Sequence, residues 1–340
     1  MKKVLVLGAS GAMGRYIVPQ LALMGYEVDA VSLDAPDASL DPPNVHRVRG
    51  NAKEEAVLAP LLAKNYDGIV DFLIHPTAEL MGSLPRLAAS TGHYVYLSSY
   101  RVYDGKDVPV REDSRLLLDT ADDKTIRYSD DYSVYKARGE YILRSLPRRN
   151  WTIIRPSITF STYRYQLVTL EAPCVVGRAD RGKTVVLPET ARNVQGTLTW
   201  AGDNARFIAR LLFNERAIGE AFTVATAEHH AWGEIAEIYA SLRGLKAEWV
   251  PEDDFLRMID PNPWNKGAAW QLRVDRLFER VIDNSKVLAA TDLAQRDLMP
   301  LAKGLETELA RVPRGFEWNM PWYESIGARM DAWLETATAL

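Results

Sequence analysis

Residues 2–16 of this 340-residue chain, "KKVLVLGASGAMGRY", are the strongest indication of its fold. An apolar run leads directly into Gly8, Gly11 and Gly14, and a helical pattern follows. Glycine lets the backbone turn sharply and approach a pyrophosphate, and the next helix offers free N–H groups at its N-terminus. The spacing departs by one residue from the G-x-G-x-x-G fingerprint. Between a strand and a helix it predicts a dinucleotide-binding loop, with an ordinary tight turn as the alternative.

Outward from this loop, short β-rich runs alternate with helical patterns. The runs predict strands at 2–8, 26–33, 44–50, 67–75, 93–99 and 151–157. The patterns between them predict helices at 14–25, 53–65, 78–91 and 132–146. Such alternation indicates an α/β fold with a Rossmann-type, doubly wound parallel sheet. Ligands then bind at the carboxyl ends of the strands.

The regular alternation stops near residue 160. Residues 1–160 are expected to form the dinucleotide-binding Rossmann domain, and a further helix and strand within 196–226 are expected to return to it. Residues 161–195 and 227–340 are expected to form a smaller, mixed C-terminal substrate-binding lobe.

Composition excludes several classes of protein. Apolar residues make up 47% and charged residues 25%, with a net charge of −4, as in soluble globular proteins. No block of Lys or Arg suggests nucleic-acid or membrane binding, and no apolar run is long enough to span a bilayer. Cys174 is the single cysteine, which fits a reducing cytoplasm. The doublet His229 and His230 lacks a third ligand at metal spacing, so no metal site is predicted.

The residues after the second and third strands indicate the cofactor. Ser32 and Asp34 stand where a ribose-binding residue is expected. Asp34 would accept ribose hydroxyls and repel a 2′-phosphate, and no cation follows until Arg47, which favours NAD over NADP. Asp34 as a turn residue before Pro36 is the alternative. Asn51 would contact the adenine or cap the next helix.

A catalytic group is expected where the fifth strand and a later helix meet. Ser98 and Ser99 end the strand, and Tyr132 and Lys136 lie one turn apart on one helix face. A nearby ammonium favours the phenolate form of a phenol, which can then exchange a proton with a hydroxyl or carbonyl. A serine hydroxyl would hold the substrate oxygen, and a nicotinamide would carry the hydride. Tyr135 points to another face and is expected to pack.

Several stretches match a known family in order and spacing. They are "GASGAMG" from residue 8, "LSSYRVYDG" at 97–105, "REDS" at 111–114, "YSVYKARGE" at 132–140 and "WTIIRPS" at 151–157. The chain resembles an extended short-chain dehydrogenase/reductase of the NAD-dependent epimerase/dehydratase family. The resemblance covers nearly the whole chain and is weakest beyond residue 250.

The resemblance implies roles for individual residues. Ser99 would bind substrate, Tyr132 would be the general acid/base, and Lys136 would bind the nicotinamide ribose and tune Tyr132. The expected cofactor contacts are Gly8, Ser10, Gly11, Ala12, Met13, Gly14, Ser32, Asp34, Asn51, Leu73, Ile74, His75, Ser98, Tyr132, Lys136, Pro156 and Ser157. The expected substrate contacts are His75, Ser99, Tyr100, Arg101, Ser157 and Arg164.

Three of these residues keep a structural alternative. His75 would face the substrate as an acid or base, or end a strand beside Pro76. Arg101 and Arg164 would clamp an anionic group, or lie on the surface as most arginines do.

Two departures from the family narrow the function. Tyr100 and Arg101 follow Ser99 where sugar 4,6-dehydratases carry Asp-Glu, so dehydration is not expected. The "RP" strand lacks the following Asn of many nucleotide-sugar enzymes, which weakens the case for a nucleoside-diphosphate sugar.

The predicted function is an NAD-dependent oxidoreductase or epimerase acting at a hydroxyl or carbonyl carbon of a sugar or sugar-nucleotide. The alternatives are an NAD(P)H-dependent ketoreductase for a small carbonyl compound and a non-catalytic dinucleotide-binding regulator. The expected partner is a carbohydrate-like small molecule. The family also implies a homodimer. The net charge of −4 argues against RNA binding.

Overall fold

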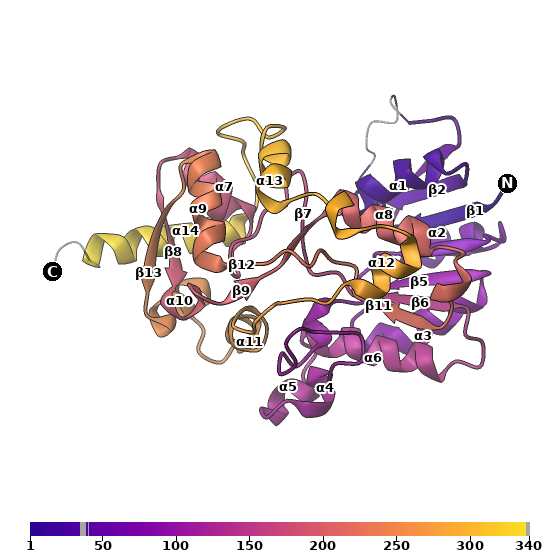
Figure 1. The fold of residues 1–340 in the computed structure, drawn as a ribbon, viewed down its shortest axis with the longest axis horizontal. Helices are drawn as coiled ribbons and strands as arrows, with labels where there is room; N and C mark the ends of the chain where they lie inside the picture. Colours follow the sequence, from indigo (N-terminus) through magenta and orange to yellow (C-terminus); the bar gives the residue numbers. More distant parts are fainter. Residues whose placement is uncertain (35–38, 40, 338–340) are drawn as a thin grey trace.

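Seven parallel strands form the central sheet of the described part of the chain. The computed structural model describes residues 1–34, 39 and 41–337, so Pro36 lies outside it. The strands run in the order β11-β6-β5-β4-β1-β2-β3 (Figure 1). Their bounds are β1 Lys3–Leu7, β2 Glu27–Ser32, β3 Val45–Arg49, β4 Gly68–Asp71, β5 His93–Leu97, β6 Trp151–Ile154 and β11 Glu220–Phe222. The predicted α/β Rossmann-type sheet is confirmed.

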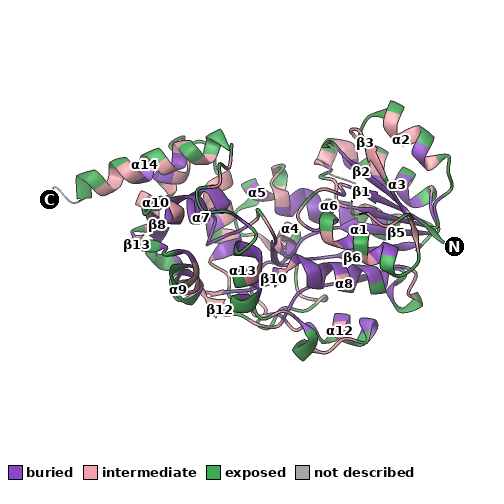
Figure 2. Cartoon of the chain, turned by 90° about the horizontal axis from the view of Figure 1, so that it is seen from above, coloured by how far each residue is buried: buried purple, intermediate pink, exposed green. Residues whose placement is uncertain are grey.

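Alternating side chains of the strands explain why helices cover both faces of the sheet. Val4 and Val6 of β1 belong to one core cluster, and Leu5 and Leu7 belong to another. The first cluster contains α1 and α8, and the second contains α2, α3 and α6. These helices span α1 Gly14–Leu23, α2 Glu55–Leu62, α3 Thr77–Ala89, α6 Tyr132–Ser145 and α8 Ala201–Leu211. The sheet is buried, whereas the outer helix faces are exposed (Figure 2).

The fourth strand is shorter than the sequence predicts. A strand was expected over 67–75, but β4 ends at Asp71. The Asp71 carboxylate accepts a hydrogen bond from the backbone N–H of Leu73 at 2.9 Å, which turns the chain out of the sheet. The residues that follow are therefore free to form a wall at the carboxyl ends of the strands.

The smaller lobe holds three two-stranded pairs surrounded by helices, within the described ranges (Figure 1). The pairs are β7 Ile158–Phe160 with β10 Leu198–Trp200, β8 Thr184–Pro188 with β13 Lys246–Val250, and β9 Gln195–Gly196 with β12 His230–Ala231. The helices are α7 Ala172–Asp180, α9 Trp232–Arg243, α10 Glu252–Ile259, α11 Gly267–Gln271, α13 Leu301–Leu309 and α14 Pro321–Ala337. Fully buried Trp232, Tyr239 and Phe255 lie in its core.

Short helical segments complete the chain. They are η1 Tyr100–Val102, α4 Leu117–Thr120, α5 Lys124–Tyr128, η2 Glu189–Ala191, η3 Glu215–Ala217, η4 Leu272–Arg276 and η5 Gln295–Asp297. In the described part of the chain, no helix is both long and apolar enough to cross a membrane.

The helix α12, Ser285–Thr291, departs from the expected division of the chain. Its residues lie within 227–340, the range expected in the smaller lobe, but α12 packs against α8 of the sheet. Val287 and Ala290 join the core beneath α1, and the Asn214 side chain donates to the carbonyl of Ala290 at 2.8 Å. These long-range contacts have no local signature in the sequence.

Candidate active site

A cavity of about 900 Å³ lies at the carboxyl ends of the central strands and reaches the smaller lobe. Its volume suits a dinucleotide together with a small substrate. Most of the expected site residues line it: Gly8, Ser10, Gly11, Ala12, Met13, Gly14, Ser32, Asp34, Asn51, Leu73, Ile74, Ser99, Tyr100, Arg101, Tyr132, Pro156, Ser157 and Arg164. Lys136, Ser98 and His75 do not contribute to its surface.

The glycine loop is shaped to admit an anion close to the backbone. Gly8 has a φ of +82°, a conformation that favours glycine. A Cβ on Gly14 would lie 2.4 Å from the carbonyl oxygen of Gly8. The backbone N–H groups of Ala12 and Met13 donate to no acceptor in the described ranges, and α1 begins immediately afterwards. This loop therefore fits the pyrophosphate of a dinucleotide.

Asp34 lines the end of the cavity where the ribose is expected. Ser32 Oγ donates to the carbonyl of Asp34 at 3.0 Å, which holds the turn after β2. The guanidinium of Arg47 is paired with Asp41 at 2.7 and 2.8 Å. Asn51 lines the cavity, while its Oδ1 accepts from the N–H of Lys53 at 3.1 Å. Both interpretations of Asn51, adenine contact and turn cap, are compatible with this position.

Tyr132 lies on the cavity wall as the first residue of α6. The side chain of Asp131 accepts from the N–H of Ser133 at 2.9 Å and so caps the helix there. Ser99 Oγ accepts from the N–H of Arg101 at 3.2 Å, which leaves its own hydrogen available to a ligand. Tyr135 is buried, and its ring packs edge-on to Tyr132 with centroids 5.4 Å apart.

Lys136 lies behind the wall, directly beneath Tyr132. Its Nζ is 5.7 Å from the centroid of the Tyr132 ring and donates to the carbonyl of Leu97 at 2.6 Å. Burial lowers the pKa of Lys136 below its usual value, because a buried ammonium is removed from bulk solvent. The ammonium is thus close enough to interact electrostatically with Tyr132, although Lys136 does not line the cavity.

Ser98 belongs to a buried network rather than to the cavity surface. Its Oγ donates to Glu140 at 2.5 Å, and Glu140 pairs with Arg155 through two hydrogen bonds. Arg155 also donates to the Tyr103 hydroxyl at 2.8 Å. This network ties α6 to β6 behind the site. The sequence held a signal for Arg155, a charged residue that directly follows the β-rich run at 151–154.

His75, expected to flank ribose and substrate, faces inward. Its Nε2 is 2.8 Å from Asp71, which also accepts from the Tyr94 hydroxyl at 2.7 Å. Asp71 is fully buried and requires donors, so it draws the imidazole away from the cavity. Although burial opposes ionisation, His75 and these hydrogen bonds hold the pKa of Asp71 below its usual value.

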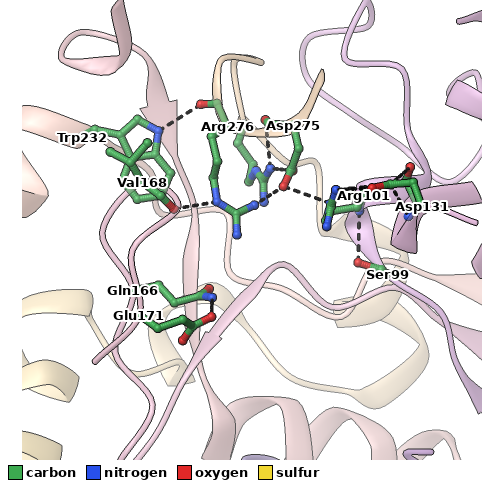
Figure 3. Close-up of polar contacts among 11 residues, drawn as sticks. Ser99, Arg101, Asp131, Gln166, Val168, Glu171, Trp232, Asp275 and Arg276 are labelled. Atoms are coloured by element: carbon green, nitrogen blue, oxygen red, sulfur yellow. Dashed lines mark hydrogen bonds and ion pairs between the residues drawn. The ribbon is translucent and has the colours of Figure 1, made fainter. Parts of the chain in front are cut away.

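The smaller lobe contributes cavity residues that the sequence did not single out. They are Gln166, Glu171, Gln271, Arg276 and Arg280. The buried Asp275 binds both Arg276 and Arg280, and it lies 3.2 Å from Nε of Arg101 in the larger lobe (Figure 3). Although burial opposes ionisation, Arg276 and Arg280 hold the pKa of Asp275 below its usual value. Three arginines therefore surround one carboxylate on the cavity wall, and one of them, Arg101, lies over the ring of Tyr132.

Solved structures similar to this chain include a dehydratase and epimerases that are named after nucleotide sugars. The dTDP-glucose 4,6-dehydratase of Bacillus anthracis, in complex with NAD, is 18% identical, with a TM-score of 0.68 over 95% of this chain and 97% of that one. The UDP-glucuronic acid 4-epimerase of Bacillus cereus, in complex with UDP-glucuronic acid and NAD, is 16% identical, with a TM-score of 0.67 over 91% and 98%. At these identities, the likeness shows the fold.

A third structure is the UDP-glucose 4-epimerase of Bifidobacterium longum with NAD+ and UDP. It is 17% identical, with a TM-score of 0.64 over 92% of this chain and 100% of that one. No curated protein matches the sequence. Residues 4–225, more than half of the chain, match the family described as "NAD dependent epimerase/dehydratase family". The chain therefore belongs to the NAD-dependent epimerase/dehydratase family, whose members are enzymes.

Proposed function

We propose that this protein is an NAD-dependent oxidoreductase or epimerase acting at a hydroxyl or carbonyl carbon of a sugar or sugar-nucleotide. The observation that carries the proposal is Tyr132 on the cavity wall, with the ammonium of Lys136 5.7 Å from its ring and the glycine loop on the same cavity. Bound NAD would accept a hydride from the substrate carbon or return one to it.

The proposed cofactor contacts follow from the shape and charge of the cavity. The glycine loop would hold the pyrophosphate against the free N–H groups of Ala12 and Met13. Asp34 would accept the ribose hydroxyls, and its charge would repel a 2′-phosphate. The guanidinium of Arg47 is ion-paired with Asp41, so Asp41 offsets much of its positive charge. These features support NAD rather than NADP.

Each of the three proposed catalytic groups has one task. Tyr132 would exchange a proton with the substrate oxygen. Lys136 would stabilise negative charge that develops on the phenol oxygen during this exchange. Ser99 would donate its hydroxyl hydrogen to the substrate oxygen and hold it beside Tyr132. In the larger lobe, the cofactor and these groups would meet at one edge of the sheet, as in other doubly wound proteins.

The substrate is proposed from the relatives, with one restriction. The similar structures hold UDP-glucuronic acid or UDP beside NAD, which supports a sugar or sugar-nucleotide. Dehydration is not proposed, because Tyr100 and Arg101 follow Ser99 where an acidic pair would be needed. The smaller lobe is proposed to bind the substrate. A homodimer and a cytoplasmic location stay predictions.

A turnover assay tests the proposal. The protein is incubated with NAD or NADH and a panel of sugars and sugar-nucleotides, with absorbance of the reduced cofactor and chromatography of the sugar followed together. A net change in NADH marks a dehydrogenase or reductase. A changed sugar at constant NADH marks an epimerase.

Two tyrosine variants of α6 make the test specific. Tyr132→Phe should lower kcat by about 100-fold or more, the usual contribution of a general acid/base, while NAD binding is retained. Tyr141→Phe is the matched control, because that tyrosine lies on the same helix with its side chain exposed. Full activity of Tyr132→Phe would refute the proposed mechanism. No turnover with any substrate, despite tight NAD binding, would favour the non-catalytic regulator.

A further inference from the structure

Arg101 is largely buried, whereas most arginine side chains are exposed to solvent. It lies in the η1 turn directly after Ser99, and its backbone N–H donates to Ser99 Oγ at 3.2 Å. Its guanidinium carbon is 5.3 Å from the centroid of the Tyr132 ring, and its side chain is 15% exposed on the cavity wall. One arginine thus contacts both groups proposed to hold the reacting oxygen.

The charges around Arg101 do not cancel. Arg101, Arg276 and Arg280 face two carboxylates, Asp131 and Asp275, which leaves one positive charge in this part of the cavity (Figure 3). The cavity wall also carries Arg164 and Glu171, whose opposite charges leave this sum unchanged. An unbalanced cation in a partly desolvated site favours an anionic ligand.

Hydrogen-bonding groups in the same place also lack partners. Nε of Arg101 is ion-paired with Asp275 at 3.2 Å, but within the described ranges it forms no hydrogen bond of good geometry. The bonds from Arg101 to Asp131 are long, at 3.3 and 3.5 Å. The hydroxyl of Tyr100 is buried and unpartnered as well, and that residue lines the cavity. A buried donor without an acceptor is costly, so these atoms indicate a ligand that accepts hydrogen bonds.

We propose that the substrate carries a carboxylate close to the carbon whose oxygen exchanges a proton with Tyr132, and that Arg101 binds this carboxylate. A carboxylate supplies the one negative charge that is missing, and a guanidinium can bind it through two parallel hydrogen bonds. Because Arg101 lies beside both Ser99 and Tyr132, the carboxylate and the reacting oxygen are separated by a few bonds. This assignment rests on the proposed function for the identity of the reacting oxygen.

Binding to the NAD-saturated protein tests the assignment independently of turnover. Calorimetry would compare each acid with its neutral amide: D-glucuronate with D-glucuronamide, D-galacturonate with D-galacturonamide, and 3-hydroxybutyrate with 3-hydroxybutyramide. D-Glucose 6-phosphate is included to test whether the site prefers a phosphate to a carboxylate. We expect at least one acid to bind about tenfold more tightly than its amide, the gain of a charge-assisted hydrogen bond.

Variants identify the residue responsible for the preference. Arg101→Met should remove the preference for the acid, and Arg101→Lys should retain part of it, because an ammonium keeps the charge and loses the paired geometry. Arg86→Met is the matched control, since Arg86 lies on α3 in an exposed ion pair with Glu55. Thermal unfolding confirms that each variant is folded, and the lysine variant carries the test if the methionine variant is not.

The assignment is overturned if acid and amide bind equally, if no member of any pair binds, if the phosphate binds most tightly, or if Arg101→Met keeps the preference. Failure of the proposed function gives a different result. In that case Tyr132→Phe would still turn over substrate, while the acid preference and its loss in Arg101→Met would remain.

Discussion

The two walls of the cavity are built in different ways. The cofactor wall consists of backbone and small side chains, Gly8 to Gly14, placed by the turn between β1 and α1. The substrate wall consists of long charged side chains, Arg101, Arg276 and Arg280, that are held by Asp131 and Asp275.

The two walls depend on contacts of different range along the chain. The cofactor wall depends on steric constraints within seven consecutive residues, so it is shaped locally. The substrate wall depends on ion pairs between residues that are far apart in the chain, such as Arg101 and Asp275, so it exists after the two lobes pack. A substitution in one wall should therefore leave the structure and the binding properties of the other wall unchanged.

The largest expected effect concerns the substrate wall. Asp275→Asn leaves three arginines facing a neutral amide, and breaking a buried ion pair in this way costs about 3–5 kcal/mol of unfolding free energy. Denaturant unfolding would measure the loss. Glu55→Gln, which removes an exposed carboxylate, should cause no measurable change. Equal stability of the two variants would show that Asp275 does not hold the substrate wall together.

A second prediction concerns the sheet away from either wall. His93 is buried with Nδ1 accepting from the N–H of Phe213 at 2.8 Å and Nε2 2.8 Å from the Thr152 hydroxyl. Burial, with a smaller contribution from the charge of Lys2, lowers the pKa of His93 to about 4.

The sign of the resulting pH dependence follows from this lowered pKa. Unfolding releases the imidazole to its usual pKa of about 6.5, so the unfolded chain takes up a proton between these values. The contribution of neutral His93 to the free energy of unfolding is fully present above pH 6.5, and about 3 kcal/mol of it is lost as the pH falls to 4. His93→Asn should flatten the curve in this window, while the exposed His46→Asn should not. If the pH dependence of the free energy of unfolding were unchanged in His93→Asn, the prediction would be contradicted. NAD affinity should be the same in both variants, because His93 lies away from both walls.

The third prediction concerns the cofactor wall. Gly14→Val should weaken NAD binding by about 100-fold, because a Cβ there would lie 2.4 Å from the Gly8 carbonyl and the loop must move. Fluorescence titration with NADH would measure it. Gly82→Ala, on α3 with no atom near its Cβ position, should bind normally. If Gly14→Val also removed the binding preference attributed to Arg101, the two walls would not be independent.

The smallest expected effect concerns cofactor choice. Asp34→Ala should weaken NAD binding by about tenfold, the contribution of hydrogen bonds to a charged group, and bring NADP closer to NAD in affinity. Titration with both cofactors would show the change. Ser32→Ala, which removes a hydroxyl bonded to the carbonyl of Asp34, should retain the preference for NAD. If Asp34→Ala left the ratio of NAD affinity to NADP affinity unchanged, Asp34 would be a turn residue rather than a ribose ligand.

Much of the fold and part of the site could be predicted from the sequence. The parallel sheet followed from alternating strand and helix patterns, and the glycine loop, Ser99 and Tyr132 followed from motifs of fixed spacing. Residues after a strand were harder to place. His75 turns toward Asp71, and Ser98 turns toward Glu140, because buried carboxylates take the nearest donors. Sequence order indicates that such residues are close to the site, but not which way they face.

The doubly wound sheet could be predicted from the sequence alone because its strands and helices each have their own period of apolar side chains and alternate along the chain. The loop that fits a pyrophosphate could be predicted because it depends on steric constraints within seven consecutive residues. The charge of the substrate wall depends on how the two lobes pack. Arg276, Arg280 and Asp275 stand in a segment without a motif, and they meet Arg101 because the smaller lobe folds back over the carboxyl ends of the strands. Charge pairs across such distances depend on packing, and no local pattern encodes them.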